Sequence, residues 1–478
     1  MFIKEELKAD GAQRKQTGES LSGLFSKRHD VSFGSKSHPS VHSTASRLRG
    51  IRVAMVAYSQ YPLEPRTRRS VDALLGEGMS VDLICLAKSD ASAIERQDGL
   101  DILRCPLVHR RGSKLAYLYN YSVFTIFSAI ILAARSLKRP YDLVYIHNMP
   151  DILVLSSLVP KALGSMVVFD IHDPMPELMM TISGLSKDSL AVRITRRFEK
   201  WSIECAHLVV TTNIAFKRVF ASRSCPREEI GIVMNSPDEQ IFPFRRPCSD
   251  AAAKGVPVKR FVIMYHGSMV KRSGLDLAVE AFAHVRESVP TAEFRIYGRK
   301  TPFLVEVMGR ARNMGLEGRV RYLGPKRLED LVHEIEDCDV GIVPNARNAF
   351  TDINMPTRIF EYLTMGKPAI APETTGIRDY FAPDSLIFFA PGDAEDLARK
   401  IEHVAFHYSG ALEIAERGQN ILLAHTWSQE RQTLANLLDR LLNGGQSGSV
   451  LTGQIQNESG RCMQPSTPDQ GPRDKNAS

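Results

Sequence analysis

Residues 142–172 read DLVYIHNMPDILVLSSLVPKALGSMVVFDIH, and this stretch decides the fold. A short run rich in Val and Ile opens it, a similar run closes it, and a helical pattern lies between them. Strands that alternate with helices are typical of parallel sheets built from βαβ units. Because parallel strands end at the same edge of a sheet, we expect His147 and His172, each at the end of a run, to face one cleft.

Similar runs continue on both sides of this stretch and form two series, separated by a polar, Pro-containing segment. The first series begins its strands at residues 51, 80, 101, 142, 166, 207 and 230, and the second at 261, 292, 319, 338, 368 and 386. The fold class that this pattern predicts is α/β, with two doubly wound Rossmann-like domains facing a central cleft. The predicted divisions are a disordered tail at 1–49, a first domain at 50–245, a second domain at 255–425, a helix crossing back to the first domain at 426–443 and a disordered tail at 444–478.

Composition narrows the class of protein. The chain has 478 residues, of which 43% are hydrophobic and 24% charged, as is typical of a globular protein with two or three domains. The net charge of +7 is modest, and no basic stripe with interleaved aromatic residues favours nucleic acid as a partner. The seven cysteines include no CxxC pair, and the N-terminus has no apolar signal core. We therefore expect a cytoplasmic protein with buried thiols rather than a disulfide framework or a zinc site.

The segment 115–134, LAYLYNYSVFTIFSAIILAA, carries no charge and has basic residues on both sides. By length alone it is sufficient to span a bilayer. It also lies between two strands of one predicted sheet, where a crossover helix belongs, and this position favours the crossover. A crossover helix that also touches a membrane surface, with the protein peripheral at the inner face of the membrane, and a true span both remain open.

The stretch NMPTRIFEYLTMGKPAIAP, residues 354–372, predicts a short helix that begins after a strand and a polar loop. Asn354 is a suitable cap, Pro356 suits the first turn, and the Gly-Lys-Pro sequence ends the helix. The free amides of such a helix start form a site for a diphosphate. Arg358 and Glu361 are three residues apart, so they share one helix face, where they suit a phosphate and vicinal hydroxyls. An ordinary surface ion pair is the alternative.

PTRIFEYLTMGKPAIAP resembles the donor-binding signature of glycosyltransferase family 4. The resemblance implies the GT-B fold and transfer of a sugar from a nucleotide sugar with retention of configuration, without a cofactor or a bound metal. It also implies that Glu361 binds the donor ribose and that the helix start, with Asn354 and Arg358, meets the diphosphate. The wider family usually has a second glutamate eight residues earlier. Ile353 stands there, so we expect the adjacent Asp352, or the backbone of this loop, to contact the donor sugar.

A second match to the same family, MYHGSMVKRSGLDLAVEAF, covers residues 264–282 and has the arrangement of a phosphate loop. The family commonly has Arg after the first glycine, Gly267, and Lys before the second. This chain has Ser268 and Ser273 at those places. Arg272 is therefore our candidate for the phosphate contact, with an exposed loop charge as the alternative.

Two further positions follow from the same resemblance. Arg299 is the local cation after the next strand, where the family's chain turns back toward the donor. Leu323 ends a further strand at the place where related proteins hold the base through backbone contacts. Both are predicted to belong to the donor site.

In the first domain, YSQYPLEPRTRRSVDALLGEG at 58–78 resembles the family's acceptor-side loop and basic helix. It contains no GxGxxG motif, which counts against a dinucleotide-dependent oxidoreductase. Arg66 at the helix start suggests an anionic acceptor, although a solvated face explains it equally well. In the family a histidine contacts the transferred sugar, which points to His172 and the adjacent Asp173 as catalytic and leaves His147 on the acceptor side. No spacing of ligands predicts a metal.

The function that these motifs predict is a retaining glycosyltransferase acting from a UDP- or GDP-sugar onto a glycan or lipid-linked acceptor. Polysaccharide or glycoconjugate biosynthesis is the expected setting. Two alternatives remain: a catalytically silent nucleotide-binding scaffold of a glycan-assembly complex, and a GT-B nucleotide-sugar epimerase. Transfer or hydrolysis of a donor would exclude the scaffold, and release of an isomerised sugar would identify the epimerase.

Overall fold

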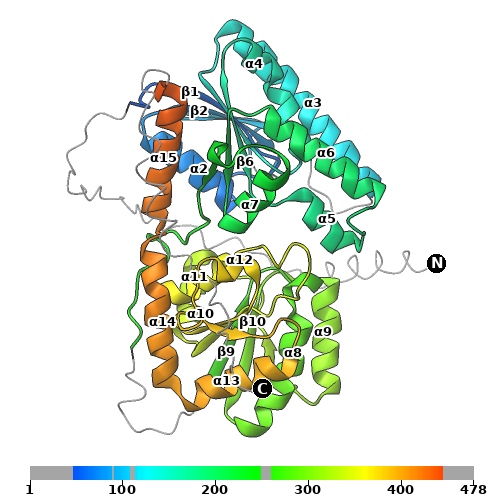
Figure 1. Cartoon of the computed structure of the whole chain (residues 1–478), viewed down its shortest axis with the longest axis vertical. Helices are drawn as coiled ribbons and strands as arrows, with labels where there is room; N and C mark the ends of the chain where they lie inside the picture. The colour runs from blue at the N-terminus through cyan, green and yellow to red at the C-terminus, as the bar shows by residue number, and fades with distance from the viewer. Residues whose placement is uncertain (1–46, 89–90, 108–113, 249–259, 445–478) are drawn as a thin grey trace, which may run out of the picture. The chain divides into compact units, whose positions relative to one another are not determined.

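The computed structural model of the protein describes residues 47–444 except 89–90, 108–113 and 249–259. The two predicted tails lie almost wholly outside the described residues. All described residues fall within one compact unit that begins at Ser46. They form two α/β domains, each built around a largely parallel sheet (Figure 1). The predicted fold class, two Rossmann-like domains, is therefore confirmed.

The first domain contains an eight-stranded sheet with the order β3-β4-β2-β1-β5-β6-β7-β8. Its strands are β1 (Arg52–Val56), β2 (Ser80–Leu86), β3 (Ile94–Gln97), β4 (Leu100–Cys105), β5 (Leu143–His147), β6 (Met166–Ile171), β7 (Leu208–Thr211) and β8 (Ile230–Ile232). All neighbouring strands are parallel except β3, which pairs antiparallel with β4 at the edge. Strand β3 is not among the predicted strands. It is only four residues long, and its sequence, IERQ, is mostly polar and mostly exposed.

Helices cover both faces of this sheet, as alternate residues of β1 show. Val53 and Met55 belong to a core that also contains residues of α2 and α15, whereas Ala54 and Val56 belong to a core with α3, α6 and α7. Successive side chains of a strand point to opposite faces, so a strand buried on both sides has a continuous apolar run. The helical elements are α2 (Pro65–Gly76), α3 (Lys114–Lys138), η1 (Asp151–Ser157), α4 (Leu158–Ala162), α5 (Met175–Ser183), α6 (Leu190–Glu204), α7 (Ile214–Arg223) and η2 (Arg227–Glu229).

The second domain contains a six-stranded, fully parallel sheet with the order β11-β10-β9-β12-β13-β14. Its strands are β9 (Phe261–His266), β10 (Ala292–Tyr297), β11 (Val320–Tyr322), β12 (Val340–Ile342), β13 (Ala369–Pro372) and β14 (Ile387–Phe389). The order reverses direction between β9 and β12, and in such sheets ligands bind beyond the strand ends near that point.

The helical elements of the second domain are η3 (Lys271–Ser273), α8 (Leu275–Ser288), α9 (Pro302–Asn313), α10 (Leu328–Glu336), α11 (Thr357–Thr364), α12 (Thr375–Arg378), α13 (Ala394–Phe406), α14 (Tyr408–Leu423) and α15 (Trp427–Asn443). The last helix, α15, returns to the first domain. There Leu434 and Leu438 are buried in the core on the α2 side of the sheet.

Helix α3 occupies the crossover between β4 and β5, the position that the sequence favoured for 115–134. Phe124 and Leu132 on its inner side are fully buried. Among the described residues, α3 is the one helix long and apolar enough to cross a membrane by length and composition. Because its inner face forms part of the domain core, α3 lies against the sheet as an integral part of this domain.

Candidate functional site

A cavity of about 730 Å³ lies between the two domains, beyond the carboxyl ends of the strands. Its lining comes from the first domain (Arg66, His172, Asp173 and Thr212) and from the loops after β9, β10, β12 and the start of α11 in the second. Five cations line it, namely Arg66, Arg272, Arg299, Lys326 and Arg358, against the two acids Asp173 and Glu361. A concave site with this excess of positive charge suits an anionic small molecule.

The loop after β9 forms part of the cavity wall. Gly267 has φ +127° and Gly274 has φ +67°, and a Cβ on Gly274 would lie 1.7 Å from the carbonyl oxygen of Pro344. Both positions therefore require glycine. Between them, the chain directs Arg272 into the cavity and leaves the neighbouring Lys271 exposed and outside its lining.

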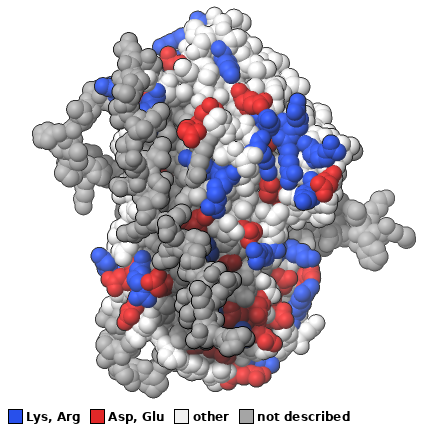
Figure 2. Space-filling model, viewed as in Figure 1, with Lys and Arg blue, Asp and Glu red and all other residues white. Residues whose placement is uncertain are grey.

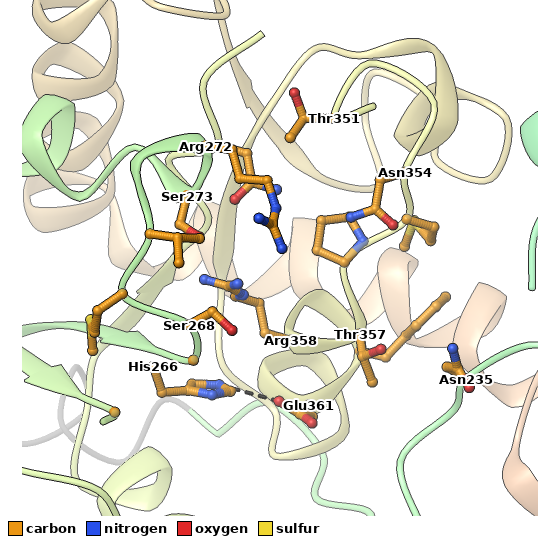
Figure 3. Close-up of a pocket in the computed structure, with 18 of the residues that line it drawn as sticks. Asn235, His266, Ser268, Arg272, Ser273, Thr351, Asn354, Thr357, Arg358 and Glu361 are labelled. Carbon is orange, nitrogen blue, oxygen red and sulfur yellow. Dashed lines mark ion pairs between the residues drawn. The ribbon is translucent and has the colours of Figure 1, made fainter. Parts of the chain in front are cut away.

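Helix α11 begins at the cavity wall, as Figure 3 shows. Pro356, rather than Asn354, is the residue before the first helical position, and no side chain caps this end. Proline holds the extended backbone that a helix entry requires, and the first-turn amides have no acceptor within the helix. Pro356 and Thr357 both line the cavity, so these amides and the positive end of the helix are available to an anion.

The guanidinium of Arg358 lies over the ring of Tyr265 at 4.8 Å, and its buried Nη1 has no hydrogen-bond partner among the described residues. Figure 3 shows the side chains of Arg272 and Arg358 converging on the same space. Burial and the charge of Arg358 lower the pKa of Arg272. Two converging cations beside a helix N-terminus form a strong site for a diphosphate.

Glu361 follows one turn after Arg358 on α11, and its Oε2 lies 3.3 Å from Nε2 of His266, the last residue of β9 (Figure 3). Burial raises the pKa of Glu361 to about 7, although Arg358 opposes this. Burial, with the nearby charge of Arg358, lowers the pKa of His266 to about 3. The imidazole is therefore neutral at physiological pH, while the carboxyl group titrates there.

The remaining predicted donor residues divide into two groups. Arg299 and Asn354 line the cavity, as do Gly267 and Ser268. Leu323 and Asp352 are outside its lining. The Leu323 side chain packs against the second-domain core, and Asp352 contacts Arg347 at 3.1 Å and Thr375 at 3.1 Å. The predicted role of Leu323 concerns its backbone and stays a prediction.

A second cavity of about 290 Å³ adjoins the first and lies in the first domain. It is lined by residues after β1, at the start of α2, on α3 and after β5, including Tyr58, Tyr121 and His147. Arg66, His172 and Asp173 line both cavities. Nη1 of Arg66 lies 3.6 Å from Asp173, so this partly exposed ion pair stands where the two cavities meet.

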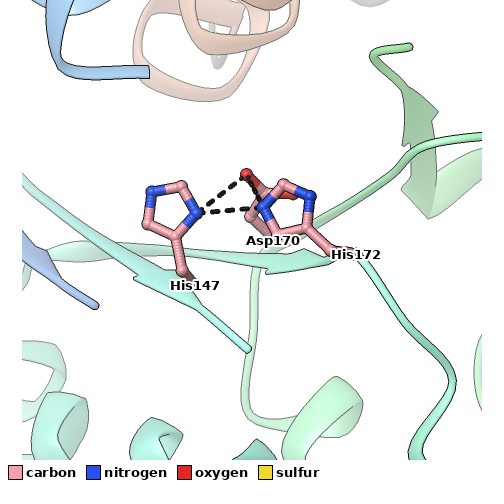
Figure 4. Close-up of side chains that lie close together, drawn as sticks. All are labelled: His147, Asp170 and His172. Atoms are coloured by element: carbon pink, nitrogen blue, oxygen red, sulfur yellow. Dashed lines mark hydrogen bonds and ion pairs between the residues drawn. The ribbon is translucent and has the colours of Figure 1, made fainter. Parts of the chain in front are cut away.

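Figure 4 shows a buried group at this junction that consists of His147, Asp170 and His172. Nδ1 of His147 and Nε2 of His172 each lie 3.3 Å from Oδ2 of Asp170 and 3.1 Å from each other. Tyr145 donates a hydrogen bond of 2.8 Å to the same oxygen. Burial would raise the pKa of Asp170, but the two imidazoles hold it well below its usual range.

An ionised Asp170 favours the tautomer of His172 that carries its proton on Nε2. Nδ1 of His172 then has a free lone pair, and it has no partner among the described residues. Asp170 thus fixes the orientation and tautomer of His172, a side chain that lines both cavities. Among the described residues these three side chains are also the one group close enough to share a metal ion.

Asp170 and His266 are the residues that the motifs did not identify. Each has a signal in the sequence, because each is a polar residue in an otherwise apolar strand, MVVFDI and FVIMYH respectively. A buried polar side chain in such a strand requires a partner, and here the partners are His172 and Glu361.

Two family models match the chain, one on each domain. The model described as "Glycosyl transferase 4-like domain" matches residues 63–236, and the model described as "Glycosyl transferases group 1" matches residues 260–407. Together they cover more than half of the chain. The fold, the cavity between the domains and these matches define a glycosyltransferase of the GT-B class. Within that class the chain belongs to the GT4 type.

Relatives and solved structures agree with this class. A D-inositol 3-phosphate glycosyltransferase of Corynebacterium urealyticum is 22% identical over 81% of this chain and 95% of its own length. Sucrose-phosphate synthase of Thermosynechococcus elongatus has a TM-score of 0.67 at 18% identity, covering 82% of this chain and all of that one. The HepE protein of Anabaena, crystallised with UDP and glucose, has a TM-score of 0.60 at 16% identity, covering 81% of this chain and 99% of that one. At these identities the structures establish the fold.

Proposed function

We propose that this protein transfers a hexose or related sugar from a UDP- or GDP-sugar to a glycan or lipid-linked acceptor, with retention of anomeric configuration. The observation that carries this proposal is the pair of cavities that share His172, Asp173 and Arg66. A donor in the larger cavity and an acceptor in the smaller one would meet at these side chains. Polysaccharide or glycoconjugate biosynthesis is the proposed setting, with the protein peripheral at the inner face of the membrane.

The larger cavity supports the donor part of the proposal. Arg272, Arg358 and the start of α11 surround a space suited to a diphosphate, and Glu361 lies one turn further along the same helix, where it can accept hydrogen bonds from a ribose. Cleavage of the sugar–phosphate bond builds negative charge on the leaving diphosphate. Fixed cations and helix amides stabilise that charge, and on this proposal they do so without a metal ion. HepE has been crystallised with UDP-glucose, so UDP-sugars are the first donors to test.

Retention follows in our proposal from attack on the same face of the sugar that the diphosphate leaves. The acceptor hydroxyl forms a bond to the anomeric carbon while the bond to the phosphate oxygen breaks, and the hydroxyl proton passes to that departing oxygen. His172 and Asp173 would position the sugar and the acceptor rather than form a covalent intermediate. Among the described residues, the acids that line the larger cavity are Asp173, which pairs with Arg66, and Glu361 at the proposed ribose site.

The test has two stages. Thermal unfolding of the purified protein with a panel of UDP- and GDP-sugars identifies the donor, because a ligand that binds the folded state raises Tm. The donor is then incubated with acceptor extracts, and NMR determines the anomeric configuration of the product. We expect one nucleotide class to raise Tm and the product to keep the donor's configuration. An inverted product would overturn retention. No hydrolysis or transfer by the donor-bound protein would favour the scaffold, and an isomerised free sugar would favour the epimerase.

A further inference from the structure

The outer side of α3 exposes a stripe of large apolar residues. Tyr119, Ile126, Ile130 and Leu137 are spaced by 7, 4 and 7 residues, so they share one helix face. They are 59% to 71% exposed. A crossover helix in a soluble α/β domain normally presents polar residues on that side. This stripe therefore suggests that a second molecule or a membrane covers the outer side of α3.

Helix α6 carries a matching stripe. Leu190, Ile194 and Phe198 follow one another at intervals of four, and each is at least 47% exposed. The segment η1 packs against both α3 and α6, and α4 packs against α3. Figure 1 shows α3, α4, α5 and α6 together on one side of the first domain. The two stripes thus belong to one surface, which we call the α3–α6 face.

The exposed charges of this face are mostly basic. From residue 102 to residue 141, a range that includes all of α3, the chain contains no acidic residue. On α6, Arg193, Arg197 and Lys200 are exposed next to the apolar stripe. Arg193 and Arg197 make no ion pair with any described residue. Figure 2 shows the corresponding concentration of blue side chains on the upper right of the molecule.

One acid of α6 lies on the inner side of the helix, and another pairs with Lys200. Glu199 is buried and is paired with Arg223 at 2.7 Å, on the inner side of the helix. Glu204 lies 3.8 Å from Lys200 at the end of the helix. Arg193 and Arg197 remain without an ion pair among the described residues. Exposed apolar side chains beside such cations are typical of helices that lie in a membrane interface.

We propose that the α3–α6 face docks onto a bilayer that contains anionic phospholipids. The apolar stripes would enter the boundary between headgroups and acyl chains, while Arg193 and Arg197 meet the lipid phosphates. A second copy of the chain is a poorer occupant. Symmetric pairing of this face with itself would bring together two sets of cations, including the unpaired Arg193 and Arg197 of each copy. A membrane span by α3 conflicts with the burial of Phe124 and Leu132 in the domain core.

The docking face is connected to the proposed acceptor cavity. Tyr121 of α3 lines that cavity together with His172, two residues along the helix from the exposed Tyr119. Docking of α3 would therefore bring the cavity close to the lipid headgroups. An acceptor with a lipid anchor could then reach His172 while its acyl chain stays in the bilayer. This inference rests on the membrane part of the proposed function.

The test measures lipid binding without donor or acceptor, so that its failure is separate from a failure of sugar transfer. The purified full-length protein is floated with vesicles of phosphatidylcholine alone and of phosphatidylcholine with phosphatidylglycerol. One variant, Arg193→Glu with Arg197→Glu, removes the exposed cations of α6. A second variant, Ile194→Gln with Phe198→Gln, removes its apolar stripe. Matched controls on the second domain are Arg310→Glu with Arg312→Glu, and Val305→Gln with Phe406→Gln, all at exposed positions.

We expect binding to anionic vesicles, at least a tenfold loss in each α6 variant, and no such loss in the controls. Each basic residue near an anionic surface strengthens membrane binding about fivefold. Reversing the charge of two arginines should therefore weaken binding by more than tenfold. The substituted side chains are exposed, and an unchanged Tm verifies the fold. Equal binding to both vesicle types, no binding, or unchanged binding in the α6 variants would overturn the proposal. A dimer by light scattering that only these variants dissociate would instead assign the face to self-association.

Discussion

Oε2 of Glu361 lies 3.3 Å from Nε2 of His266, which joins the first turns of α11 to the end of β9 at the floor of the larger cavity. Burial separates the pKa values of the pair, to about 7 for Glu361 and about 3 for His266. A neutral imidazole can accept a hydrogen bond from the protonated carboxyl group. A bound donor would need the ionised carboxylate, because the ribose hydroxyls donate hydrogen bonds and the carboxylate accepts them.

Donor binding should therefore weaken as pH falls below about 7. If the donor binds the ionised form of Glu361, its Kd should rise by roughly tenfold per pH unit below that pKa and level off above it. Titration calorimetry from pH 5.5 to 8.5 measures this. In Glu361→Gln the Kd should be higher and independent of pH, whereas a Kd in the native protein that stays constant across this range would rule out the assignment.

The same carboxyl group should make the free protein less stable as pH rises. Its folded-state pKa is raised, so its contribution to stability is present below the unfolded value near 4.5 and is lost as pH passes through about 7. We expect Glu361→Gln to gain stability over the native protein between pH 5 and pH 8, as measured by urea unfolding. Glu306→Gln, at an exposed position of α9, is the control and should show no such trend.

Arg272→Ala and Arg358→Ala should each lower kcat/KM for the donor by roughly 100-fold to 1000-fold, because each removes a cation from the proposed diphosphate site. Lys271→Ala is a matched control, since Lys271 precedes Arg272 in η3 but lies outside the cavity lining. Steady-state kinetics at saturating acceptor measures the effect. A loss in Lys271→Ala as large as that in Arg272→Ala would show that the loop, rather than the guanidinium, is responsible.

Asp170→Asn should lower kcat by roughly 10-fold to 100-fold with little change in donor Kd, because the tautomer of His172 would no longer be fixed. Tyr145→Phe removes a hydrogen bond to the same carboxylate and leaves both histidine contacts in place, so it should have a smaller effect. Single-turnover rates, measured together with donor Kd values, distinguish a slower transfer step from weaker donor binding. If donor affinity falls as much as kcat, Asp170 supports binding instead.

Removal of metals should leave sugar transfer unchanged, because the arginines and the start of α11 take the place of a cation at the diphosphate. Activity after dialysis against EDTA, compared with activity after addition of Mg²⁺, Mn²⁺ or Zn²⁺, tests this. Metal analysis of the purified protein provides a second measurement. A stoichiometric metal that is lost in His147→Ala would assign the His147–Asp170–His172 group to metal binding.

Gly274→Ala should destabilise the second domain. Its φ of +67° costs a non-glycine residue about 1 kcal/mol or more, and the new Cβ would meet the carbonyl oxygen of Pro344 at 1.7 Å. Gly309→Ala, within α9 and with no atom within 4 Å of the new Cβ, should instead be neutral or stabilising. Urea unfolding of both variants measures the difference.

Much of the fold was predictable, because buried parallel strands have continuous apolar runs that are separated by helix-length segments. The edge strand β3 was missed because its residues, IERQ, are not apolar and because it pairs antiparallel within a parallel series. The membership of the chain in the GT4 type was also predictable, since it depends on local motifs such as the one around Glu361. The residues of such a motif are close together in sequence, so the motif can be identified without knowledge of the folded structure.

The site was less predictable where side-chain direction matters. The carboxylate of Asp352 contacts Arg347 and Thr375, a geometry that its position next to Ile353 does not indicate, and its predicted contact with the donor sugar stays a prediction. His266 contacts Glu361 on another element, and Asp170 contacts His147 from a neighbouring strand as well as the nearby His172, so motif matching alone did not identify either residue.

Helix α15 supplies Leu434 and Leu438 to the core of the first domain, although it is the last described helix in the chain. On the ribosome, the first domain therefore emerges without one wall of its core and can complete it only when translation has passed residue 443. The N-terminal half should accordingly keep part of its apolar core exposed until late in synthesis. A nonsense mutation just before Trp427 would damage the half of the protein that was made first.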